Sequence, residues 1–529
     1  MGAASLTTYL ERIIEVGVMA LPTAPLLWLI VHRSFWSAFP RVAVRAICLL
    51  VAYAVFLAWL AIRHPIGLRF LAGPVALLIA YEVWRARPSY GRGRRLPPGS
   101  LVPLPLFPVM DDRAYLKEAA RHGGVFKTSQ LGLGGSPNPC PVFSWKQGVR
   151  AHLGLVHPMV CVVGLDRAIE ALRRFDDVLT PPAVPFTRFI PGGFFRYMSG
   201  EPHRRYRQLF RIAFSGRVVK ECEAEIVTEV RRALDHMAQE GSAAGARPDV
   251  FLGPMAATIF ARVFFGIASD SPALARLDAL YRVLAVPRNA PARAVRPALV
   301  EAMAIARASA TRPDAPGSFL GELVRARADA LDDRTVMANL VYMVHTTSKD
   351  VADLVAWILK LLSDHPVWID RLRGDRSPDS DGGLADRIVQ ETLRLAQSEY
   401  LYRKVPHDLE IGGFVVPKGW LLRLCIRESH RDPRVFDRPD AFDPDRFLRR
   451  TFTQAEYAPF GAFERSCLGI HLTVTVARLF VITLAREFDW TVVEDGPREF
   501  RGWHWAPSAR FRIRVTPRRP EAVAVAASQ

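Results

Sequence analysis

The sequence predicts a mainly α-helical protein with small β-sheets, preceded by an N-terminal transmembrane helical segment. The first 84 residues are strongly apolar, whereas the rest of the 529-residue chain has the composition of an ordinary globular protein. Helical hydrophobic spacing dominates this second part, and short β-rich runs with Gly and Pro turns occupy residues 409–426. A chain of this length can bury a large core and carry an extra module.

The composition limits the classes of partner. The formal net charge is +18, and Arg far outnumbers Lys, which favours anionic lipid headgroups or an acidic protein. The basic residues are spread among predicted helices rather than gathered with aromatics, so no nucleic acid partner is expected. The six cysteines form no CxxC pair and no regular framework, which argues against a disulfide scaffold or a zinc site and for a reducing compartment.

The apolar N-terminal part contains three candidate membrane stretches, residues 16–31, 46–62 and 70–81. Each is somewhat short of the roughly 20 residues of a full crossing. Basic residues follow the first and third stretches, and the positive-inside rule then places the next domain in the cytoplasm. The absence of a basic leader argues against a cleaved signal peptide. We therefore expect two or three transmembrane helices within residues 1–90, in a bacterial plasma membrane. Buried core helices of a soluble protein are the alternative.

The chain after the anchor divides into a Pro-rich hinge at residues 91–108, a domain at 109–517 and a flexible tail at 518–529. The predicted helices are residues 111–122, 166–175, 220–307 with a break at 287–297, 334–362 and 383–395. The predicted strands are residues 159–164, 409–411, 414–416, 421–426, 488–493 and 511–515. Residues 442–447 are expected on a loop. The helix at 334–362 is apolar nearly all round and should be central.

The stretch at residues 459–469, PFGAFERSCLG, places a lone thiol before an apolar run with helical spacing. At a helix N-terminus Cys467 would meet partial positive charge and free backbone N–H groups, which favour a thiolate. A thiolate ligand of haem iron needs such surroundings, because it donates electron density to iron and favours O–O cleavage. The alternative is a buried structural cysteine before an ordinary helix.

Two further motifs place charged residues on one helix face. His203 and Arg207 are four residues apart, a spacing that suits binding of an anionic group such as a carboxylate. A solvated basic face is the alternative. Glu391 and Arg394 have the spacing of an ion pair. The aromatic loop at residues 181–200 could form a wall against a ligand or simply pack.

The middle of the long helix carries polar residues in an apolar setting, His345-Thr346-Thr347-Ser348. Such hydroxyls usually bond back to a carbonyl one turn earlier. In the functional alternative, Thr346 kinks the helix and presents its hydroxyl to a bound ligand.

Taken in order, these motifs resemble the cytochrome P450 family of haem-thiolate monooxygenases. The resemblance covers about residues 96–517 and rests on five features. They are a His-xxx-Arg helix, a long helix with Thr-Thr, Glu-xx-Arg, an aromatic–Asp-Arg-Phe loop, and Phe…Arg-x-Cys-x-Gly. The resemblance implies the cytochrome P450 fold for this domain.

The resemblance also implies haem b as the cofactor, with Cys467 as the axial thiolate ligand of its iron. The implied cofactor-binding residues are His203, Arg207, Arg403 and Arg465 for the propionates, with Phe460 and Gly469. Lys404 is the alternative to Arg403, because the length of that loop varies in the family. The implied catalytic residues are Thr346, His345 and Thr347. The implied buried triad behind the haem is Glu391, Arg394 and Arg446.

Three departures from the family pattern bear on the reaction. Phe463 stands where the family has Gly and cannot take glycine's torsions freely, so the loop is reshaped or places an aromatic ring against the cofactor. Tyr342 and Met343 replace a small pair and narrow the oxygen-side groove. His345 replaces the acid that relays protons. With an unperturbed pKa of about 6.5 it could still relay them, or it marks a reaction other than O₂ activation.

The implied function is an O₂-dependent monooxygenase that hydroxylates or epoxidises an apolar, membrane-partitioning substrate. Electrons would come from a separate ferredoxin or flavoprotein reductase, since no reductase domain is visible in the sequence. One alternative is an isomerase, a dehydratase or a peroxide-using enzyme of the same family. Another is a non-catalytic haem-binding membrane protein.

Overall fold

A computed structural model describes residues 95–103, 112–131, 156–181, 187, 189–240, 244–284, 292–312, 316–374, 383–396, 401–501 and 504–518. The predicted membrane helices of residues 1–90, Phe186 of the aromatic loop and nearly all of the predicted tail lie outside these residues. The chain divides into two compact units. The first comprises residues 1–139, 143–161 and 407–422, and the second comprises 140–142, 162–406 and 423–529.

The described residues of the first unit form one helix and five short strands. Its elements are β1 (Gly99–Pro103), α6 (Asp112–His122), β2 (Val125–Leu131), β3 (Val156–Val162), β5 (Leu409–Ile411) and β6 (Phe414–Val416). Strand β1, which lies in the predicted hinge, pairs in parallel with β2. Strands β5 and β6 form the predicted hairpin, and Gly412 and Gly413 both have positive φ, 59° and 76°, as a tight two-residue turn requires.

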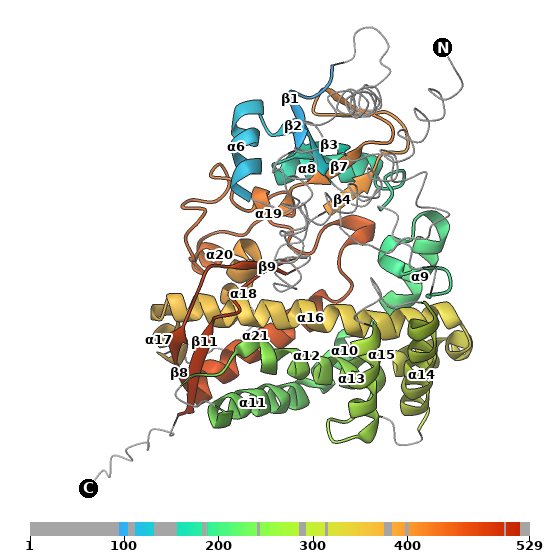
Figure 1. The fold of residues 1–529 in the computed structure, drawn as a ribbon, viewed down its shortest axis with the longest axis vertical. Helices are drawn as coiled ribbons and strands as arrows, with labels where there is room; N and C mark the ends of the chain where they lie inside the picture. The colour runs from blue at the N-terminus through green and yellow to red at the C-terminus, as the bar shows by residue number, and fades with distance from the viewer. Residues whose placement is uncertain are drawn as a thin grey trace, which may run out of the picture. The chain divides into compact units, whose positions relative to one another are not determined.

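The second unit is mainly helical (Figure 1). Its first helices are α8 (Leu165–Phe175), η2 (Phe195–Tyr197), α9 (Gly200–Ala213), α10 (Gly216–Glu221), α11 (Glu223–Glu240), α12 (Pro248–Phe265), α13 (Pro272–Leu284), α14 (Ala292–Ala310), α15 (Phe319–Ala326) and η3 (Ala328–Leu331). The later ones are α16 (Arg334–Asp364), α17 (Val367–Gly374), α18 (Leu384–Leu395), α19 (Ile426–Ser429), α20 (Arg446–Arg449), η4 (Phe463–Arg465) and α21 (Ile470–Glu487).

Short strands complete this unit. They are β4 (Leu401–Lys404), β8 (Phe488–Glu494), β9 (Glu499–Arg501), β10 (His504–Ala506) and β11 (Arg512–Pro517). Strands β8 and β11 pair antiparallel, with Val492 opposite Ile513, as the two terminal runs predict. Strand β7 (Leu421–Leu424) lies at the division between the units. The prediction of a mainly α protein with small sheets is confirmed.

Helix α16 is the central element that the sequence predicts, and it runs across the second unit in Figure 1. Asp333 begins it by accepting hydrogen bonds from the backbone N–H groups of Thr335 and Val336, at 2.8 and 3.2 Å. Such a cap satisfies two of the N–H groups that the first turn leaves without partners. Most of its 31 residues are buried.

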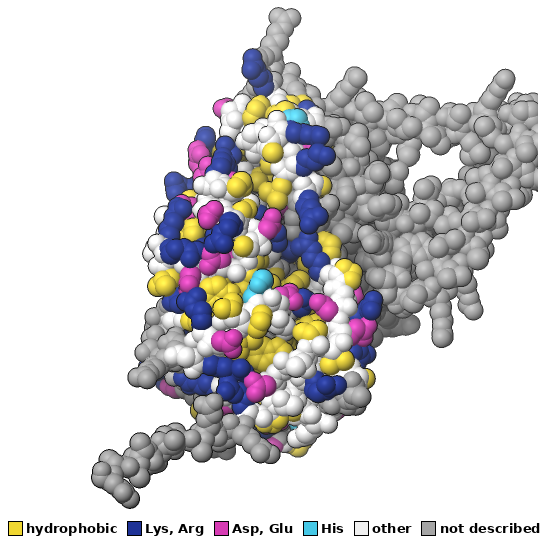
Figure 2. All heavy atoms as spheres, turned by 90° about the vertical axis from the view of Figure 1, so that its left-hand side faces the viewer, with side chains coloured by type: hydrophobic (Ala, Val, Ile, Leu, Met, Phe, Trp, Pro, Cys, Tyr) yellow, Lys and Arg dark blue, Asp and Glu magenta, His cyan; other side chains and the backbone are white. Residues whose placement is uncertain are grey.

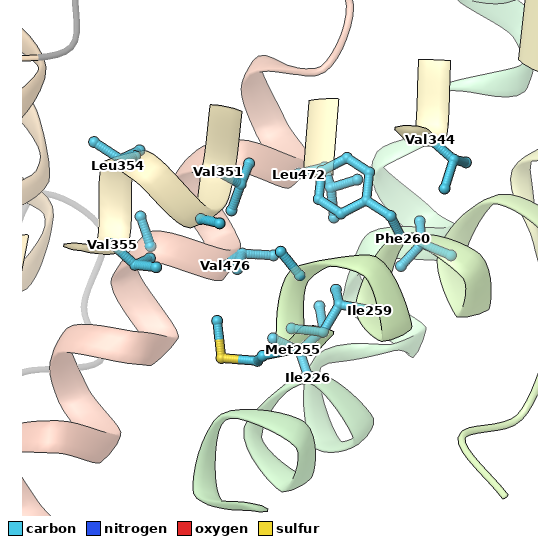
Figure 3. Close-up of a cluster of buried hydrophobic side chains, with 14 of the residues drawn as sticks. Ile226, Met255, Ile259, Phe260, Val344, Val351, Leu354, Val355, Leu472 and Val476 are labelled. Carbon is cyan, nitrogen blue, oxygen red and sulfur yellow. The ribbon is translucent and has the colours of Figure 1, made fainter. Parts of the chain in front are cut away.

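The core of the second unit joins α16 to α21, the helix that follows the predicted iron ligand. Figure 3 shows side chains from four helices meeting there: Ile226 of α11, Met255, Ile259 and Phe260 of α12, Val344, Val351, Leu354 and Val355 of α16, and Leu472 and Val476 of α21. All are buried. Because each buried aliphatic side chain contributes about 1.5–3 kcal/mol, this packing holds α16 and α21 in one arrangement.

Several predicted boundaries are wrong. The helical run predicted at residues 220–307 is divided into separate helices, α11 to α14, and the strand predicted at 159–164 ends at Val162. The break at residues 287–297 extends too far, because α14 begins at Ala292 and contains Pro297, whose place in the N-terminal half of the helix removes one hydrogen bond. The strand predicted at residues 421–426 ends at Leu424, and α19 follows it. The loop predicted at 442–447 runs into α20 at Arg446.

One helix among the described residues, α12, is apolar and long enough to cross a membrane by length and composition alone. Just over half of it, 56%, is buried within the protein. Its side chains form part of the core in Figure 3, which identifies it as a core helix.

Charged side chains of both signs lie close together on the face drawn in Figure 2. Around α17 and α20, Arg371 pairs with Asp445 at 2.7 Å and Arg449 pairs with Asp443 at 2.6 Å. These two pairs neutralise positive charge locally around α17 and α20.

Candidate functional site

The loop before α21 holds Cys467 in a fixed position. The Cys467 N–H donates to the Phe460 carbonyl at 2.9 Å, and the Ser466 N–H donates to the Phe463 carbonyl at 3.1 Å. These bonds close the loop around the short helix η4. The Cys467 side chain is solvent-accessible although protein atoms surround it densely.

The surroundings of Cys467 only partly match the prediction of a thiolate. The backbone N–H of Gly469, the residue that caps α21, bonds the sulfur and lowers the pKa of the thiol. Burial has the larger effect, and the pKa is raised overall. The helix N-terminus alone therefore does not ionise this thiol. A metal ion would, because coordination deprotonates a thiol outright.

Phe463 adopts a backbone torsion that is typical of glycine. Its φ is +53°, in the left-handed region, where a bulky residue is strained, in keeping with the prediction that Phe cannot take this torsion freely. The bonds from Ser466 to the Phe463 carbonyl, from its backbone N–H at 3.1 Å and its hydroxyl at 2.9 Å, hold the turn. For a bulky residue this conformation costs about 1–2 kcal/mol.

A pair of substitutions at Phe463 would isolate this torsional cost. We expect Phe463→Ala to lower the free energy of unfolding by about 1 kcal/mol more than Phe463→Gly, because both lose the ring but Ala keeps the torsional penalty. Urea unfolding of both variants measures the difference. Equal midpoints, or a less stable glycine variant, would contradict the assignment of strain.

Four predicted cofactor-binding residues converge beside the Cys467 loop. His203 and Arg207 come from α9, Arg403 from β4 and Arg465 from η4. Arg207 donates to the Ser466 carbonyl at 3.0 Å and to the Ser466 hydroxyl at 2.9 Å, which ties α9 to the loop. We call His203, Arg207, Arg403 and Arg465 the cationic cradle.

The electrostatics of the cationic cradle favour an anionic ligand. Burial and then the neighbouring arginines lower the pKa of His203 to about 3, and burial and then Arg465 lower the pKa of Arg403 to about 9. The Nε atoms of Arg207 and Arg403 are buried and have no hydrogen-bond partner among the described residues, although Glu464 Oε2 lies 3.7 Å from Arg207 Nε. Several positive charges thus lie close together, and some of their N–H groups make no hydrogen bond. Bound carboxylates would reduce the repulsion and accept these N–H groups.

Arg403 and Lys404 are the two predicted candidates for one propionate-binding residue, and they differ in their exposure to solvent. They are neighbours on β4, not on a loop as expected, so their side chains point to opposite faces. Arg403 is 5% exposed, whereas Lys404 is exposed to solvent. Only the arginine shares the surroundings of His203.

The predicted catalytic residues lie together on α16. Thr346 donates to the carbonyls of Tyr342 and Met343 at 3.1 and 3.2 Å, and Thr347 donates to that of Met343 at 2.7 Å. Of the two alternatives for Thr346, the structure has the one in which the hydroxyl bonds back to carbonyls one turn earlier. Asp350, one turn further along, contributes to the raised pKa of Cys467, so this part of α16 lies within electrostatic reach of the thiol.

His345 lies in an aromatic cluster rather than in a polar relay. Its ring stacks on that of Tyr281 of α13, with centroids 5.5 Å apart, and meets Tyr342 edge-on at 5.8 Å. Tyr342 in turn contacts Phe194 of the aromatic loop at 5.2 Å. Burial lowers the pKa of His345 to about 4, so its imidazole is neutral at physiological pH.

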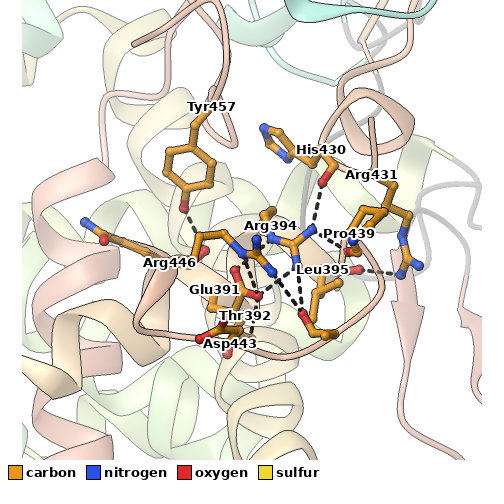
Figure 4. A network of polar contacts seen from close by, with 12 residues as sticks. Glu391, Thr392, Arg394, Leu395, His430, Arg431, Pro439, Asp443, Arg446 and Tyr457 are labelled. Carbon is orange, nitrogen blue, oxygen red and sulfur yellow. Dashed lines mark hydrogen bonds and ion pairs between the residues drawn. The ribbon is translucent and has the colours of Figure 1, made fainter. Parts of the chain in front are cut away.

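Glu391 forms the predicted buried network with Arg394 and Arg446 (Figure 4). Its carboxylate accepts two bonds of 2.7 Å from Arg394 and one of 3.3 Å from Arg446. It also accepts the backbone N–H of Asp443 at 2.9 Å. Glu391 and Arg394 are fully buried, so the carboxylate depends on these partners for its charge.

This network extends to the chain just before the Cys467 loop, through two residues that the sequence did not identify. Tyr457 donates to the Gln390 carbonyl at 2.8 Å (Figure 4). His430 Nε2 accepts the Ala458 N–H at 3.0 Å. Burial and then Arg394 lower the pKa of His430 to about 3, which keeps that nitrogen an acceptor. No sequence signal separates His430 and Tyr457 from other aromatic residues.

A sequence model of the family described as Cytochrome P450 matches residues 299–502. The chain is 28% identical over 223 residues to abscisic acid 8'-hydroxylase 2 of Arabidopsis thaliana, covering 38% of this chain and 46% of that protein. It is 24% identical over 479 residues to abscisic acid 8'-hydroxylase 2 of Oryza sativa subsp. indica, covering 79% and 88%. The match with the first of these relatives thus spans about half of that relative's length.

Solved structures share the fold. A retinoic acid bound cyanobacterial CYP120A1 superimposes with a TM-score of 0.62 at 20% identity, covering 80% of this chain and all of that one. A zebra fish cytochrome P450 with abiraterone gives a TM-score of 0.58 at 19% identity, covering 77% of this chain.

Proposed function

Since this chain belongs to the cytochrome P450 family, we propose that it is a haem-thiolate monooxygenase that inserts one oxygen atom of O₂ into an apolar substrate. The observation that carries the proposal is the meeting of an accessible thiol, Cys467, with the cationic cradle beside it. One iron ligand and donors for two carboxylates are what haem b requires. The relatives named as hydroxylases support hydroxylation, but their substrate is not carried over at 24–28% identity.

Cys467 would ligate the iron, and the cationic cradle would bind the propionates. The spare N–H groups of Arg207 and Arg403 would bond propionate oxygens, and His203 would regain a proton as that negative charge offsets the arginines. The Phe460 carbonyl accepts the backbone N–H of Cys467, and the Gly469 N–H bonds the sulfur. When bound, haem supplies the activation of O₂, to which the thiolate contributes electron density.

The residues of α16 would serve the opposite side of the cofactor. The Thr346 hydroxyl, held by two carbonyls, keeps its oxygen lone pairs for water, and Thr347 limits the space beside it. Tyr342, packed on Phe194, would restrict the groove to slender apolar groups. His345 is neutral, so it could pass a proton only by accepting one at one ring nitrogen and releasing another from the second ring nitrogen.

Partners follow from the chain's charge and its apolar N-terminal part. A net charge of +18 suits an acidic electron donor, a ferredoxin or a flavoprotein reductase. Anchoring through residues 1–90 would place the domain at a membrane, where a lipophilic substrate partitions.

Peroxide-driven oxidation or rearrangement of an already oxygenated substrate is the second candidate. His345 favours it, because a neutral imidazole stacked on Tyr281 replaces the carboxylic acid expected before Thr346. Reactions that start from an O–O bond already present in the substrate need fewer protons delivered from this side.

A reconstituted assay separates the two candidates. The full chain loaded with haem in detergent is supplied either with NAD(P)H, a ferredoxin and its reductase under ¹⁸O₂, or with hydrogen peroxide alone, against a library of lipophilic compounds. We expect product with one ¹⁸O atom in the first reaction. Product from peroxide alone, with none from the reductase system, would replace the proposal by the second candidate.

Substitution of His345 tests proton delivery directly. We expect His345→Asp to raise the fraction of NAD(P)H electrons that reach product, by roughly tenfold or more, since positioned acids contribute about 10²–10⁴-fold to such steps. The variant should leave peroxide-driven turnover nearly unchanged. Because the pKa of His345 is about 4, the wild-type rate should show no inflection near pH 6.5 from this residue. An unchanged coupling fraction would contradict the assignment.

A further inference from the structure

Asp176 is a half-buried acidic residue that acts on the cationic cradle and that none of the family motifs includes. It is the first residue after α8, and its N–H donates to the Leu172 carbonyl at 2.8 Å. Four residues later, Thr180 pairs with Lys404 in an antiparallel bridge, with N···O distances of 3.3 and 2.7 Å. This bridge leads the chain from α8 to β4, next to Arg403.

The position of Asp176 is unfavourable for a carboxylate in two ways. A helix C-terminus carries partial negative charge, so an acid there is destabilised. The Asp176 Oδ1 atom is also buried, and it has no hydrogen-bond partner among the described residues. The next residue, Asp177, is exposed to solvent and meets neither condition.

Three arginines of the cationic cradle act on Asp176. Burial has the largest effect and raises the pKa of Asp176 overall, while Arg403 and then Arg465 lower it; Glu464 raises it and Arg207 lowers it by smaller amounts. The effect is mutual, because Asp176 raises the pKa of both Arg403 and Arg465. In the described part of the chain no hydrogen bond or ion pair of 4.0 Å or less joins Asp176 to these arginines, so their N–H groups stay available to a ligand.

When Asp176 is ionised, the buried and half-buried groups of this site carry a net charge that two propionates would balance. Arg207, Arg403 and Arg465 carry three positive charges, Asp176 carries one negative charge, and His203 is neutral, which leaves +2. Haem brings two propionates. Glu464, whose Oε2 atom lies 3.7 Å from Arg207 Nε, is 61% exposed and therefore screened by solvent.

We propose that Asp176 is a fixed counter-charge of the haem site, which brings the net charge of the cationic cradle to the value that two propionates balance. It acts on Arg403 and Arg465 through space, by reducing the repulsion between their positive charges. The proposal rests on haem binding in the proposed function but not on the reaction that the haem performs.

Asp176→Asn tests this role, with Asp177→Asn as the matched control and Asp176→Glu as the charge-restoring variant. Removing the negative charge leaves the cradle more positive, so the propionates are held more firmly. We expect haem transfer to apomyoglobin to slow by roughly two- to tenfold, the range that one unit charge a few ångströms away produces at high effective dielectric. The haem reduction potential should also rise, because the ferrous form carries one more negative charge.

The control and the restored charge make the outcome decisive. Asp177→Asn should match wild type in both measurements, and Asp176→Glu should lie close to wild type. Equal values for Asp176→Asn and wild type would overturn the proposal, as would loss of haem from Asp176→Asn, since the proposal requires firmer binding. Failure of the wild-type chain to bind haem would instead overturn the proposed function, so the two failures are distinguishable.

Discussion

Cys467→Ser is expected to abolish the red-shifted absorbance band that thiolate-ligated haem gives when reduced and bound to CO. Serine keeps the size of the side chain and the loop bonds made by the backbone N–H of residue 467. Its hydroxyl, however, cannot serve as a thiolate, so electron donation to iron is lost. The measurement is the difference spectrum of dithionite-reduced protein with and without CO, and the expected result is complete loss of the shifted band.

Cys222→Ala is the matched control for this experiment. Cys222 is fully buried, and burial raises the pKa of its thiol to about 11, so it has neither the access nor the charge of a ligand. The control should keep the shifted band. A Cys467→Ser protein that retained the band would show that another residue holds the iron and would remove the central assignment.

Glu391→Ala is expected to yield haem-poor, partly unfolded protein. The substitution leaves Arg394, which is fully buried, and Arg446 without the carboxylate that receives their N–H groups. Breaking one member of a buried ion network typically costs about 3–5 kcal/mol, a large part of the stability of a protein domain. Haem content per chain and the midpoint of urea unfolding measure the effect.

Two companion variants identify the cause. Glu391→Gln keeps the shape of the side chain and removes its charge, so a loss similar to that of Glu391→Ala would assign the effect to the unpaired arginines rather than to a cavity. Glu170→Ala, at a side chain 63% exposed on α8, should change neither quantity. Normal haem content and stability in Glu391→Ala would show that the network is dispensable.

The sequence predicts those parts of the site that depend on local spacing. The length of α16 follows from its hydrophobic pattern, and the pairing of Glu391 with Arg394 follows from three residues of separation on a helix. The polar run in α16 left two alternatives for Thr346, and the back-bonded one is present because its hydroxyl reaches carbonyls three and four residues earlier.

Contacts between distant segments could not be predicted in this way. Arg207 and Ser466 are 259 residues apart, and their bond depends on how α9 packs beside the Cys467 loop. The roles of His430 and Asp176 likewise come from neighbours that tertiary packing supplies, and burial rather than sequence determines their ionisation. The membrane helices of residues 1–90 stay a prediction.

The torsion of Phe463 also bears on how distant relatives of this chain can be recognised. Two bonds from Ser466 hold the turn in the left-handed region without glycine, so the same backbone shape can form when another residue replaces the glycine. A search pattern that demands glycine four residues before the cysteine would pass over this chain. A pattern based instead on Ser466, which bonds the turn, and on Arg207 of α9, which bonds Ser466, would find the same loop in sequences without this glycine.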